Sequence, residues 1–255
     1  MSKMWIYVVT RGRPHVKDQH TLNNLPQKWR ERTTVVCPKE ERHFFDDVYG
    51  IETVSPRVMN ITAKRKWIFE NAAYEKILML DDDLRFHVRP EPLKSTRLVL
   101  GSENPIKLIR MFDALDKKLD SVAHVGISDR FMNHVVEGEW KYGCKALHAL
   151  GWRVSRVLEH CKLDRVMCGV EHDLTLQLFE AGFPNAVYFW GTQSEPAGRA
   201  APGGTSLYRT SKMIWESARK MEKLHPGIVK VVPIREDQQH MLPRVRIAWQ
   251  KALRT

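Results

Sequence analysis

Ile77-Leu78-Met79-Leu80-Asp81-Asp82-Asp83-Leu84 is a short apolar run that leads directly into three consecutive carboxylates. An apolar run of this length predicts a buried strand. Three adjacent acids repel one another, and a divalent cation is the natural counter-charge because hard cations bind carboxylate oxygens. Alternate side chains of an extended backbone point the same way, so we expect Asp81 and Asp83 on one side, one facing a ligand's hydroxyls and the other a metal. A solvated acidic turn that caps the next helix is the alternative.

Apolar runs and helical patterns alternate along the chain on both sides of this stretch. The alternation predicts an α/β fold, a three-layer sandwich with a mainly parallel sheet, in one domain spanning residues 1–255. Asn104-Pro105 predicts a helix start, since asparagine caps helices and proline fits their first turn. We interpret 128–143 as an active-site loop and 191–207 as a lid, a binding loop or a disordered segment. The expected strands lie at residues 5–10, 34–37, 77–80, 122–127, 144–150, 186–190 and 229–232, and the expected helices at 63–75, 105–119, 152–161, 171–181 and 211–224.

The composition excludes several classes of protein. The 255 residues are 43% hydrophobic, enough for a substantial core, and no stretch approaches the roughly 18–20 apolar residues that span a bilayer. The apolar run at residues 5–9 is too short for the core of a secretory signal. The 4 cysteines are scattered without paired spacing. We therefore expect a soluble, cytoplasmic protein with reduced thiols and no membrane partner.

The formal net charge of +11 predicts attraction to polyanions such as nucleic acid, anionic membrane surfaces or acidic polysaccharide. A basic protein that merely stays soluble is the alternative. Part of the excess lies in a basic C-terminal segment at about residues 235–255, where Arg244, Arg246, Lys251 and Arg254 flank Trp249. Such a segment can stack on or pair with nucleic acid, or it can be a docked terminal helix.

Two groups of cations are placed to hold a phosphorylated ligand. Thr10 ends the first predicted strand, and Arg11 and Arg13 follow it in a turn that contains a glycine. Ligands of open α/β sheets bind at the carboxyl ends of strands. Lys64 and Arg65 lie at the start of a predicted helix, where exposed N–H groups and the helix dipole already favour anions. Two cations there suit a diphosphate, and a solvated basic helix face is the alternative.

Two acids open the predicted helix at residues 171–181. Glu171 and Asp173 are in its first turn, where an acid commonly caps the helix. Alternatively, one of them is a carboxylate base aimed at a hydroxyl, as group transfer requires.

In this order of motifs the chain resembles the GT-A fold of nucleotide-sugar glycosyltransferases, over roughly residues 4–190. The family's Asp-x-Asp motif holds a divalent metal and the donor diphosphate. The resemblance implies that Asp81 contacts the nucleoside or its ribose, that Asp83 binds Mn²⁺ or Mg²⁺, and that Arg65 pairs with the phosphates. It places Glu171 or Asp173 where inverting members keep their base. The implied donor-binding residues are Thr10, Arg11, Arg13, Lys64, Arg65, Asp81 and Asp82, and the implied metal ligands are Asp81 and Asp83.

A tighter resemblance is carried by residues 202–209 (PGGTSLYR) and 224–230 (LHPGIVK). They are similar to phage-type TET/JBP-associated glycosyltransferases, a family thought to add sugars to hydroxymethylated pyrimidines in DNA. The resemblance implies a UDP-sugar or similar donor, DNA as partner, and a location in the host cytoplasm if the chain is phage-encoded. One departure is that Gly191-Thr192-Gln193 lacks the metal-binding histidine that many GT-A enzymes place there, and His225 lies far downstream. The expected acceptor-binding residues are Arg130, Trp140, Gly203, Gly204 and Arg209.

Other functions remain open from the residues alone. The aspartates could serve a two-metal phosphohydrolase or nuclease, although no further cluster of acids and histidines supplies a second metal. A nucleic-acid-binding protein without catalysis, dominated by Trp249 and its basic neighbours, would leave the acidic triplet unexplained. A surface glycan or a small molecule is the alternative acceptor. His160, Cys161, Cys168 and His172 match no common zinc spacing and are expected to be structural.

Overall fold

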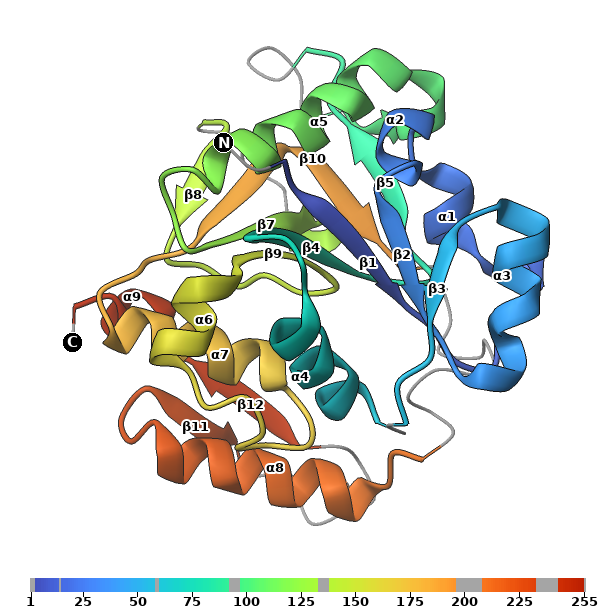
Figure 1. The fold of residues 1–255 in the computed structure, drawn as a ribbon. Helices are drawn as coiled ribbons and strands as arrows, with labels where there is room; N and C mark the ends of the chain where they lie inside the picture. The colour runs from blue at the N-terminus through green and yellow to red at the C-terminus, as the bar shows by residue number, and fades with distance from the viewer. Residues whose placement is uncertain are drawn as a thin grey trace, which may run out of the picture.

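The computed structural model describes residues 3–13, 15–57, 60–91, 97–132, 138–195, 208–232 and 243–254. A central ten-stranded sheet crosses the molecule in the order β3-β2-β1-β4-β9-β7-β10-β5-β6, with β8 paired to β10 (Figure 1). Its strands are β1 (Trp5–Val9), β2 (Thr33–Val36), β3 (Glu52–Val54), β4 (Lys76–Asp81), β5 (Arg85–Val88), β6 (Val99–Leu100), β7 (His124–Asp129), β8 (Trp140–Tyr142), β9 (Ala149–Arg153) and β10 (Ala186–Ser194). The helices are α1 (His20–Asn24), α2 (Gln27–Arg30), α3 (Arg42–Tyr49), α4 (Ile61–Asn71), α5 (Pro105–Lys118), α6 (Val154–His160), α7 (Val170–Glu180), α8 (Ser211–Leu224) and α9 (Trp249–Ala252).

The sheet is mainly parallel in strand direction. Strands β3, β2, β1 and β4 run parallel to one another, and β10 runs parallel to β7. Strand β9 lies between β4 and β7 and is antiparallel to both, as β5 is to β10. The α/β class expected from the sequence is therefore confirmed, with local reversals at β9, β5 and β8.

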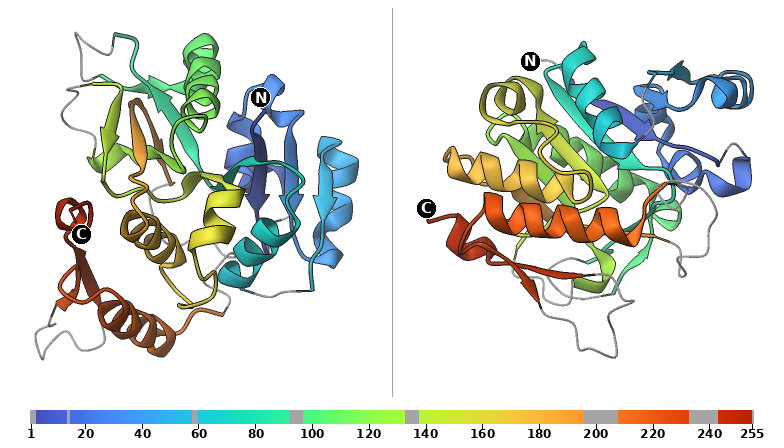
Figure 2. Two further views of the ribbon diagram at one scale, coloured as in Figure 1. Left: turned by 60° about the vertical axis from the view of Figure 1, so that its left-hand side comes forward. Right: turned by 90° about the horizontal axis from the view of Figure 1, so that it is seen from below.

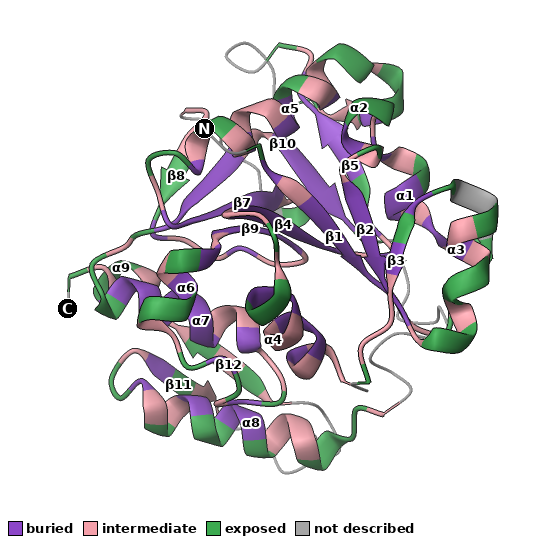
Figure 3. Cartoon of the chain, in the orientation of Figure 1, coloured by how far each residue is buried: buried purple, intermediate pink, exposed green. Residues whose placement is uncertain are grey.

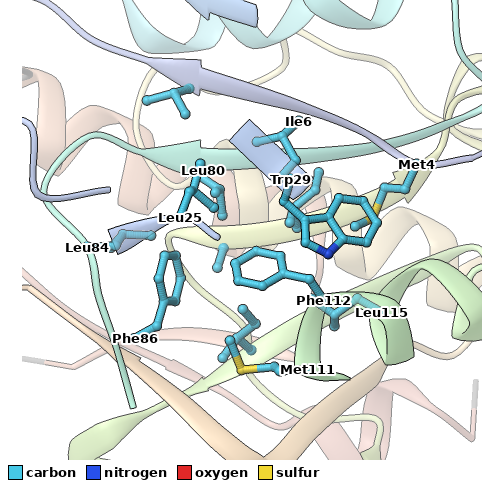
Figure 4. Packing of buried hydrophobic residues seen from close by; sticks show 14 of the residues in the cluster. Met4, Ile6, Leu25, Trp29, Leu80, Leu84, Phe86, Met111, Phe112 and Leu115 are labelled. Atoms are coloured by element: carbon cyan, nitrogen blue, oxygen red, sulfur yellow. The ribbon is translucent and has the colours of Figure 1, made fainter. Parts of the chain in front are cut away.

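Helices cover both faces of the sheet, because alternate strand residues are apolar on each side. In β1, Ile6 and Val8 belong to the core under α1, α2 and α5, whereas Tyr7 and Val9 belong to the core under α4, α6 and α7. In the first core the ring of Phe112 lies 5.2 Å from that of Phe86 (Figure 4). The inner strands β1, β2, β4, β7 and β9 are accordingly buried along nearly their whole length (Figure 3). The strands β3, β6 and β8 are more exposed.

Capping residues set several helix starts where the sequence predicts them. The Asn104 side chain accepts a hydrogen bond from the Lys107 N–H, and Pro105 occupies the first helical turn of α5. Asn60 caps α4 in the same way by accepting from the Ala63 N–H. Helix α8 has the predicted bounds, and the Thr210 side chain caps it.

Several boundaries differ from the expectation. The helix predicted at 63–75 lies at Ile61–Asn71, and the strand predicted at 122–127 lies at His124–Asp129. The strand predicted at 144–150 lies at Ala149–Arg153, because Gly143 and His148 adopt positive φ angles of 60° and 63° that interrupt an extended run. Helix α6 consequently starts at Val154. The strand predicted to end at residue 190 continues to Ser194, where it pairs with both β5 and β7.

The C-terminal part adds a second, two-stranded sheet. Strands β11 (Val229–Val232) and β12 (Arg244–Ile247) pair antiparallel, and with α8 and α9 they pack outside α7 (Figure 2). The Trp249 ring lies 5.5 Å from that of His172 and 6.1 Å from that of Phe179. This tryptophan is therefore part of a docked helix, which is one of the two arrangements expected from the sequence. Among the helices in the described ranges, none is both long and apolar enough to cross a membrane.

Candidate active site

The carboxyl edge of the sheet brings residues from distant parts of the chain together. Strands β1 and β4 end side by side, with Val9 opposite Asp81. Strand β9 is antiparallel to β4 and therefore begins at this same edge, with Ala149 opposite Leu80. The residue before it, His148, receives a 3.0 Å hydrogen bond at its carbonyl from the Asp81 N–H. A strand end and a strand start thus meet at one point.

The central cluster consists of Asp81, His148 and Glu195. His148 Nδ1 lies 2.8 Å from Asp81 Oδ2 and 3.1 Å from Glu195 Oε1. One ligand atom from each residue lies within 4.8 Å of the others. His148 is the one non-glycine residue of the described ranges with a positive φ, a conformation that costs energy and is typical of functional sites.

The electrostatics of this cluster favour a positive charge between the carboxylates. Burial alone would lower the pKa of His148, but the hydrogen bond and charge of Asp81, with the charges of Glu195 and Glu171, raise it to about 9. Burial likewise opposes ionisation of Asp81, yet His148 and Arg65 hold its pKa below the usual value. The raised pKa of His148 favours the protonated imidazole between these two carboxylates.

Arg65 links this cluster to Glu171. Its guanidinium donates to Glu171 Oε2 at 2.8 Å and to Asp81 Oδ1 at 3.3 Å. Burial would raise the pKa of Glu171, but the Arg65 charge outweighs it, so the pKa is lowered and the carboxylate is ionised. The site thus brings together three of the sequence-predicted residues.

Asp82 and Asp83 leave the strand, so the expected alternation of Asp81 and Asp83 does not hold. The chain turns directly after Asp81. Asp82 is buried and accepts hydrogen bonds from the Thr10 hydroxyl and the Arg13 guanidinium, and burial raises its pKa to about 7. Asp83 pairs with Arg13 at 2.9 Å, whereas Asp81 pairs with Arg65 and His148.

Lys64 and Arg11, two of the expected donor-binding cations, both contact other parts of the chain. Lys64 is buried and donates to the Thr10 carbonyl at 2.8 Å, which ties α4 to the end of β1; burial lowers its pKa. It is therefore not presented to a ligand, contrary to expectation. The Arg11 guanidinium lies 5.8 Å from the centre of the Tyr208 ring, and the Tyr208 hydroxyl accepts from the Ile61 N–H at the start of α4.

Asp173 lies in a separate buried network, although it is only two residues from Glu171. Its side chain is fully buried and accepts two hydrogen bonds from Arg165, at 2.6 and 3.1 Å. Gln177 and His225 complete its contacts, with His225 Nε2 at 2.8 Å. Asp173 therefore has no access to a substrate, and His225 is committed to this network rather than to Asp81.

The expected acceptor-binding residues are scattered. Arg130 directly follows β7 and lies 3.2 Å from His87 Nε2. Trp140 pairs with Tyr188 in the amino-terminal part of β10, at the opposite end of that strand from Glu195, so it is not part of the site. Arg209 is exposed beside Tyr208. Gly203 and Gly204 lie outside the described residues.

No local pattern in the sequence points to His148, Glu195 or Tyr208 as site residues. His148 has no local signal, since its role depends on the pairing of β9 with β4. Glu195 would have been found if the strand ending at residue 190 had been extended to Ser194, because an acid would then follow a strand end directly. Tyr208 lies within the quoted 202–209 stretch, but no role was assigned to it.

The alternative metal sites are not formed among the described residues. Asp81, His148 and Glu195 are the one group of three or more acids, histidines and cysteines there that could hold a metal ion. A second cluster for a two-metal phosphohydrolase is therefore lacking in those ranges, and His160, Cys161, Cys168 and His172 do not form a zinc site.

Several solved structures share this fold. Glucosyl-3-phosphoglycerate synthase from Mycobacterium tuberculosis, in complex with Mn²⁺, uridine diphosphate and glucosyl-3-phosphoglycerate, is 9% identical, covers 96% of this chain and 87% of its own, and has a TM-score of 0.54. The structure of the same synthase with Mg²⁺ and uridine diphosphate is 10% identical to this chain, and the match covers 96% of this chain and 87% of that one, with a TM-score of 0.54. A mycobacterial protein is 11% identical, and the match covers 96% of this chain and 84% of that one, with a TM-score of 0.52. At these identities the likeness shows the fold, which is the GT-A type expected from the sequence.

Comparison by sequence is more specific than comparison by fold. A search of curated proteins finds no match. The family model described as TET-Associated Glycosyltransferase matches residues 4–187, almost the span over which the resemblance was expected. The chain belongs to the TET-associated glycosyltransferase family.

Proposed function

We propose that this glycosyltransferase moves a sugar from a nucleoside diphosphate sugar, such as a UDP-sugar, to the hydroxyl of a hydroxymethylated pyrimidine in DNA, with Mn²⁺ or Mg²⁺ as cofactor. The observation that carries the proposal is the cluster of Asp81, His148 and Glu195 beside Arg65 at the carboxyl edge of the sheet. Ligands of open α/β sheets bind at this edge.

The residues of the cluster fit a divalent cation. Two carboxylates and an imidazole offer oxygen and nitrogen ligands within 4.8 Å of one another, and such a set suits Mn²⁺ better than Mg²⁺ because Mg²⁺ prefers oxygen alone. We propose Asp81, His148 and Glu195 as ligands, with Asp83 as a further candidate. When bound, the cation neutralises the negative charge that develops on the leaving diphosphate.

Cationic side chains would hold the donor. Arg65 is fixed by two carboxylates next to the cluster, and Arg13 is fixed by Asp82 and Asp83. Arg11 lies at the Tyr208 ring, beside the start of α4. We propose that these three guanidiniums bind the diphosphate, since arginine matches phosphate geometry through paired N–H donors.

Glu171 is the proposed base. It is ionised and half-buried next to Asp81, so it can accept the proton of the acceptor hydroxyl. The acceptor oxygen forms a bond to the anomeric carbon while the bond from that carbon to the diphosphate breaks, and the leaving group takes the bonding electrons. A single displacement of this kind inverts the anomeric configuration.

Two properties support DNA as the acceptor. The formal net charge is +11, and the exposed residues Arg209 and Arg130 lie near the carboxyl edge. A modified base would leave the helical stack to reach Glu171, at a cost of a few kcal/mol. A glycan or small-molecule acceptor would need no such step.

Nucleoside analysis tests the proposal directly. The chain is incubated with Mn²⁺, a panel of UDP- and GDP-sugars, and DNA that contains hydroxymethylated pyrimidines, and the digested nucleosides are analysed by mass spectrometry. We expect one nucleoside to gain the mass of one sugar, and unmodified DNA to remain unchanged. Hydrolysis of a donor without modification of DNA would exclude the acceptor, and failure of every donor to bind would exclude the donor site.

A further inference from the structure

The C-terminal part of the chain carries most of the excess positive charge. In the ranges 208–232 and 243–254 there are ten lysines and arginines and two glutamates. The net charge of these two ranges is therefore +8, out of a formal net charge of +11 for the whole chain. The charge is therefore concentrated on α8, β11, β12 and α9 rather than spread evenly.

The outward face of the two-stranded sheet is basic. Lys230 lies directly opposite Arg246 in the ladder, and Arg244 is two residues from Arg246 on the same face. All three are exposed. The opposite face carries Val229, Val245 and Ile247, which pack into the core. Like charges directly opposite each other destabilise a strand pair, so this arrangement is costly unless an anion binds there.

The end of α8 continues this surface. Arg219, Lys220 and Lys223 are exposed on its last turns, whereas Ala218 and Met221 are buried beneath them. Only residues 225–228 separate α8 from β11. We call Arg219, Lys220, Lys223, Lys230, Arg244 and Arg246 the basic face. Within the described ranges, none of the six forms an ion pair with a carboxylate.

Helix α8 connects the basic face to the candidate active site. It starts three residues after Tyr208, whose hydroxyl accepts from the Ile61 N–H and whose ring contacts Arg11. Its 14 residues span about 21 Å, roughly six steps of about 3.4 Å along a DNA strand. Figure 2 shows α8 along the outside of the molecule, with β12 beside it.

We propose that the basic face binds the phosphate backbone of a DNA duplex, to one side of the base that enters the active site. The identity of the polyanion rests on the proposed function, while the position of the surface rests on the charges alone. Exposed lysines and arginines that contact phosphates release condensed counterions, so binding through them weakens steeply with salt. The basic face holds the duplex while Glu171 accepts the proton of the hydroxyl on the extruded nucleotide.

Removal of three charges from the two-stranded sheet tests the surface. The variant is Lys230→Gln/Arg244→Gln/Arg246→Gln. The matched control is Lys107→Gln/Arg110→Gln/Lys117→Gln on α5, which covers the opposite face of the central sheet (Figure 1). Each lowers the net charge by three. Binding to a labelled DNA duplex is measured by fluorescence anisotropy at several salt concentrations, alongside Tm and donor hydrolysis with Mn²⁺.

We expect the β11–β12 variant to bind duplex DNA roughly 100-fold more weakly at 0.1 M salt, with a salt slope smaller by about 2 to 3, because each phosphate contact contributes about 0.9 to the slope. Its Tm should be unchanged or higher, since a repulsive pair is removed, and donor hydrolysis should be unchanged. The α5 control should bind as the unmodified chain does.

Equal losses in the variant and the control would overturn the proposal, as would tighter binding to an RNA duplex than to DNA. Absence of DNA binding by the unmodified chain would also overturn it, even if the donor is hydrolysed. Conversely, DNA binding that the β11–β12 variant loses, in a chain that uses no donor, would support the basic face and contradict the proposed function. The two failures are thus distinguishable.

Discussion

Arg65 donates a 2.8 Å hydrogen bond to Glu171, although 106 positions separate them in the sequence. The same guanidinium reaches Asp81 at 3.3 Å. The ion pair joins α4 to the first turn of α7 directly beside the end of β4. One buried cation therefore holds in place both the proposed base and a proposed metal ligand.

Asp81→Asn should abolish metal binding and most of the activity. The amide keeps the shape and an acceptor for Arg65, but it lacks the charge that attracts a cation and the His148 proton. Loss of one electrostatic contact of this kind costs about 3–4 kcal/mol in barrier, or 10²–10³ in turnover. Mn²⁺ binding is measured by electron paramagnetic resonance, and turnover by donor hydrolysis.

A second site variant and a control variant accompany this measurement. Asp83→Asn should lower turnover to a similar extent and leave the fold intact, because the side chain is near the surface and pairs with Arg13. Asp113→Asn removes an exposed carboxylate that pairs with Lys28 and should change neither measurement. Turnover near that of the unmodified chain in Asp81→Asn would refute the assignment of the site.

Glu171→Gln should separate chemistry from donor binding. The amide can still accept from Arg65, but it cannot take the proton of the acceptor, and loss of a general base typically costs 10²–10⁴ in rate. Sugar transfer should fall by that factor, while donor affinity, measured by calorimetry, should change little. A product that retains the anomeric configuration would show that Glu171 does not act as an inverting base.

Asp173→Asn should act on stability instead of chemistry. It leaves Arg165 and His225 without their buried carboxylate, and breaking a buried pair of this kind costs about 3–5 kcal/mol. Urea denaturation should show this loss, while kcat of the remaining folded enzyme should be close to normal. If kcat fell by 10²-fold with stability unchanged, Asp173 would be catalytic.

Gly126→Ala should disturb His148 from a distance. A Cβ atom at Gly126 would lie 2.4 Å from the Ala146 Cβ, two residues before His148, so the 144–148 segment must shift. We expect weaker Mn²⁺ binding and a loss of about 1–3 kcal/mol in stability. Gly138→Ala, where an added Cβ meets nothing within 4 Å, is the control, and a second change, Ala146→Gly, should restore binding.

Stability should decrease in acid because of His124. Burial lowers its pKa to about 4, below the value near 6.5 of an unfolded chain. Between these two pKa values the unfolded state binds more protons than the folded state. The contribution of neutral His124 to the free energy of unfolding is therefore complete above pH 6.5 and is lost as the pH falls towards 4. The loss amounts to roughly 3 kcal/mol. In His124→Asn the amide can still donate to the Gly151 carbonyl, and urea denaturation from pH 7.5 to 5 should give a flatter profile.

Local patterns were sufficient to predict much of the fold. The Asn104-Pro105 helix start, α8 and β11 depend on nearest neighbours and on one apolar face, and the structure confirms them. The strand predicted at 144–150 is wrong because positive φ angles at Gly143, just before this stretch, and at His148, within it, interrupt the extended backbone. No side-chain pattern predicts the angle at His148. The segment also packs closely against β7, since a Cβ atom at Gly126 would lie 2.4 Å from the Ala146 Cβ, and such a tertiary contact is not visible in a local pattern.

The candidate site was harder to predict than the fold, because its contacts join distant segments. Asp81, Arg65 and Glu171 were found because a strand end and two helix starts can be recognised locally. The histidine partner of Asp81, however, is His148, which is 67 positions away in the sequence. Its position beside Asp81 depends on the antiparallel pairing of β9 with β4. Lys64 and Asp82 were expected at the ligand, but their burial is set by packing against β1, which composition cannot reveal.

The reversed orientation of β9 makes His148 sensitive to packing at the other end of the same strand. Trp152 is buried opposite Ile77, and its ring stacks on His124 at 3.6 Å. A slip of the ladder by one residue would turn every side chain of β9 to the other face, and the imidazole would be carried along the strand with the indole. Trp152 lies about 13 Å from His148 along the backbone. Substitutions of Trp152 should therefore change metal affinity as well as stability, because the position of His148 depends on the register of β9.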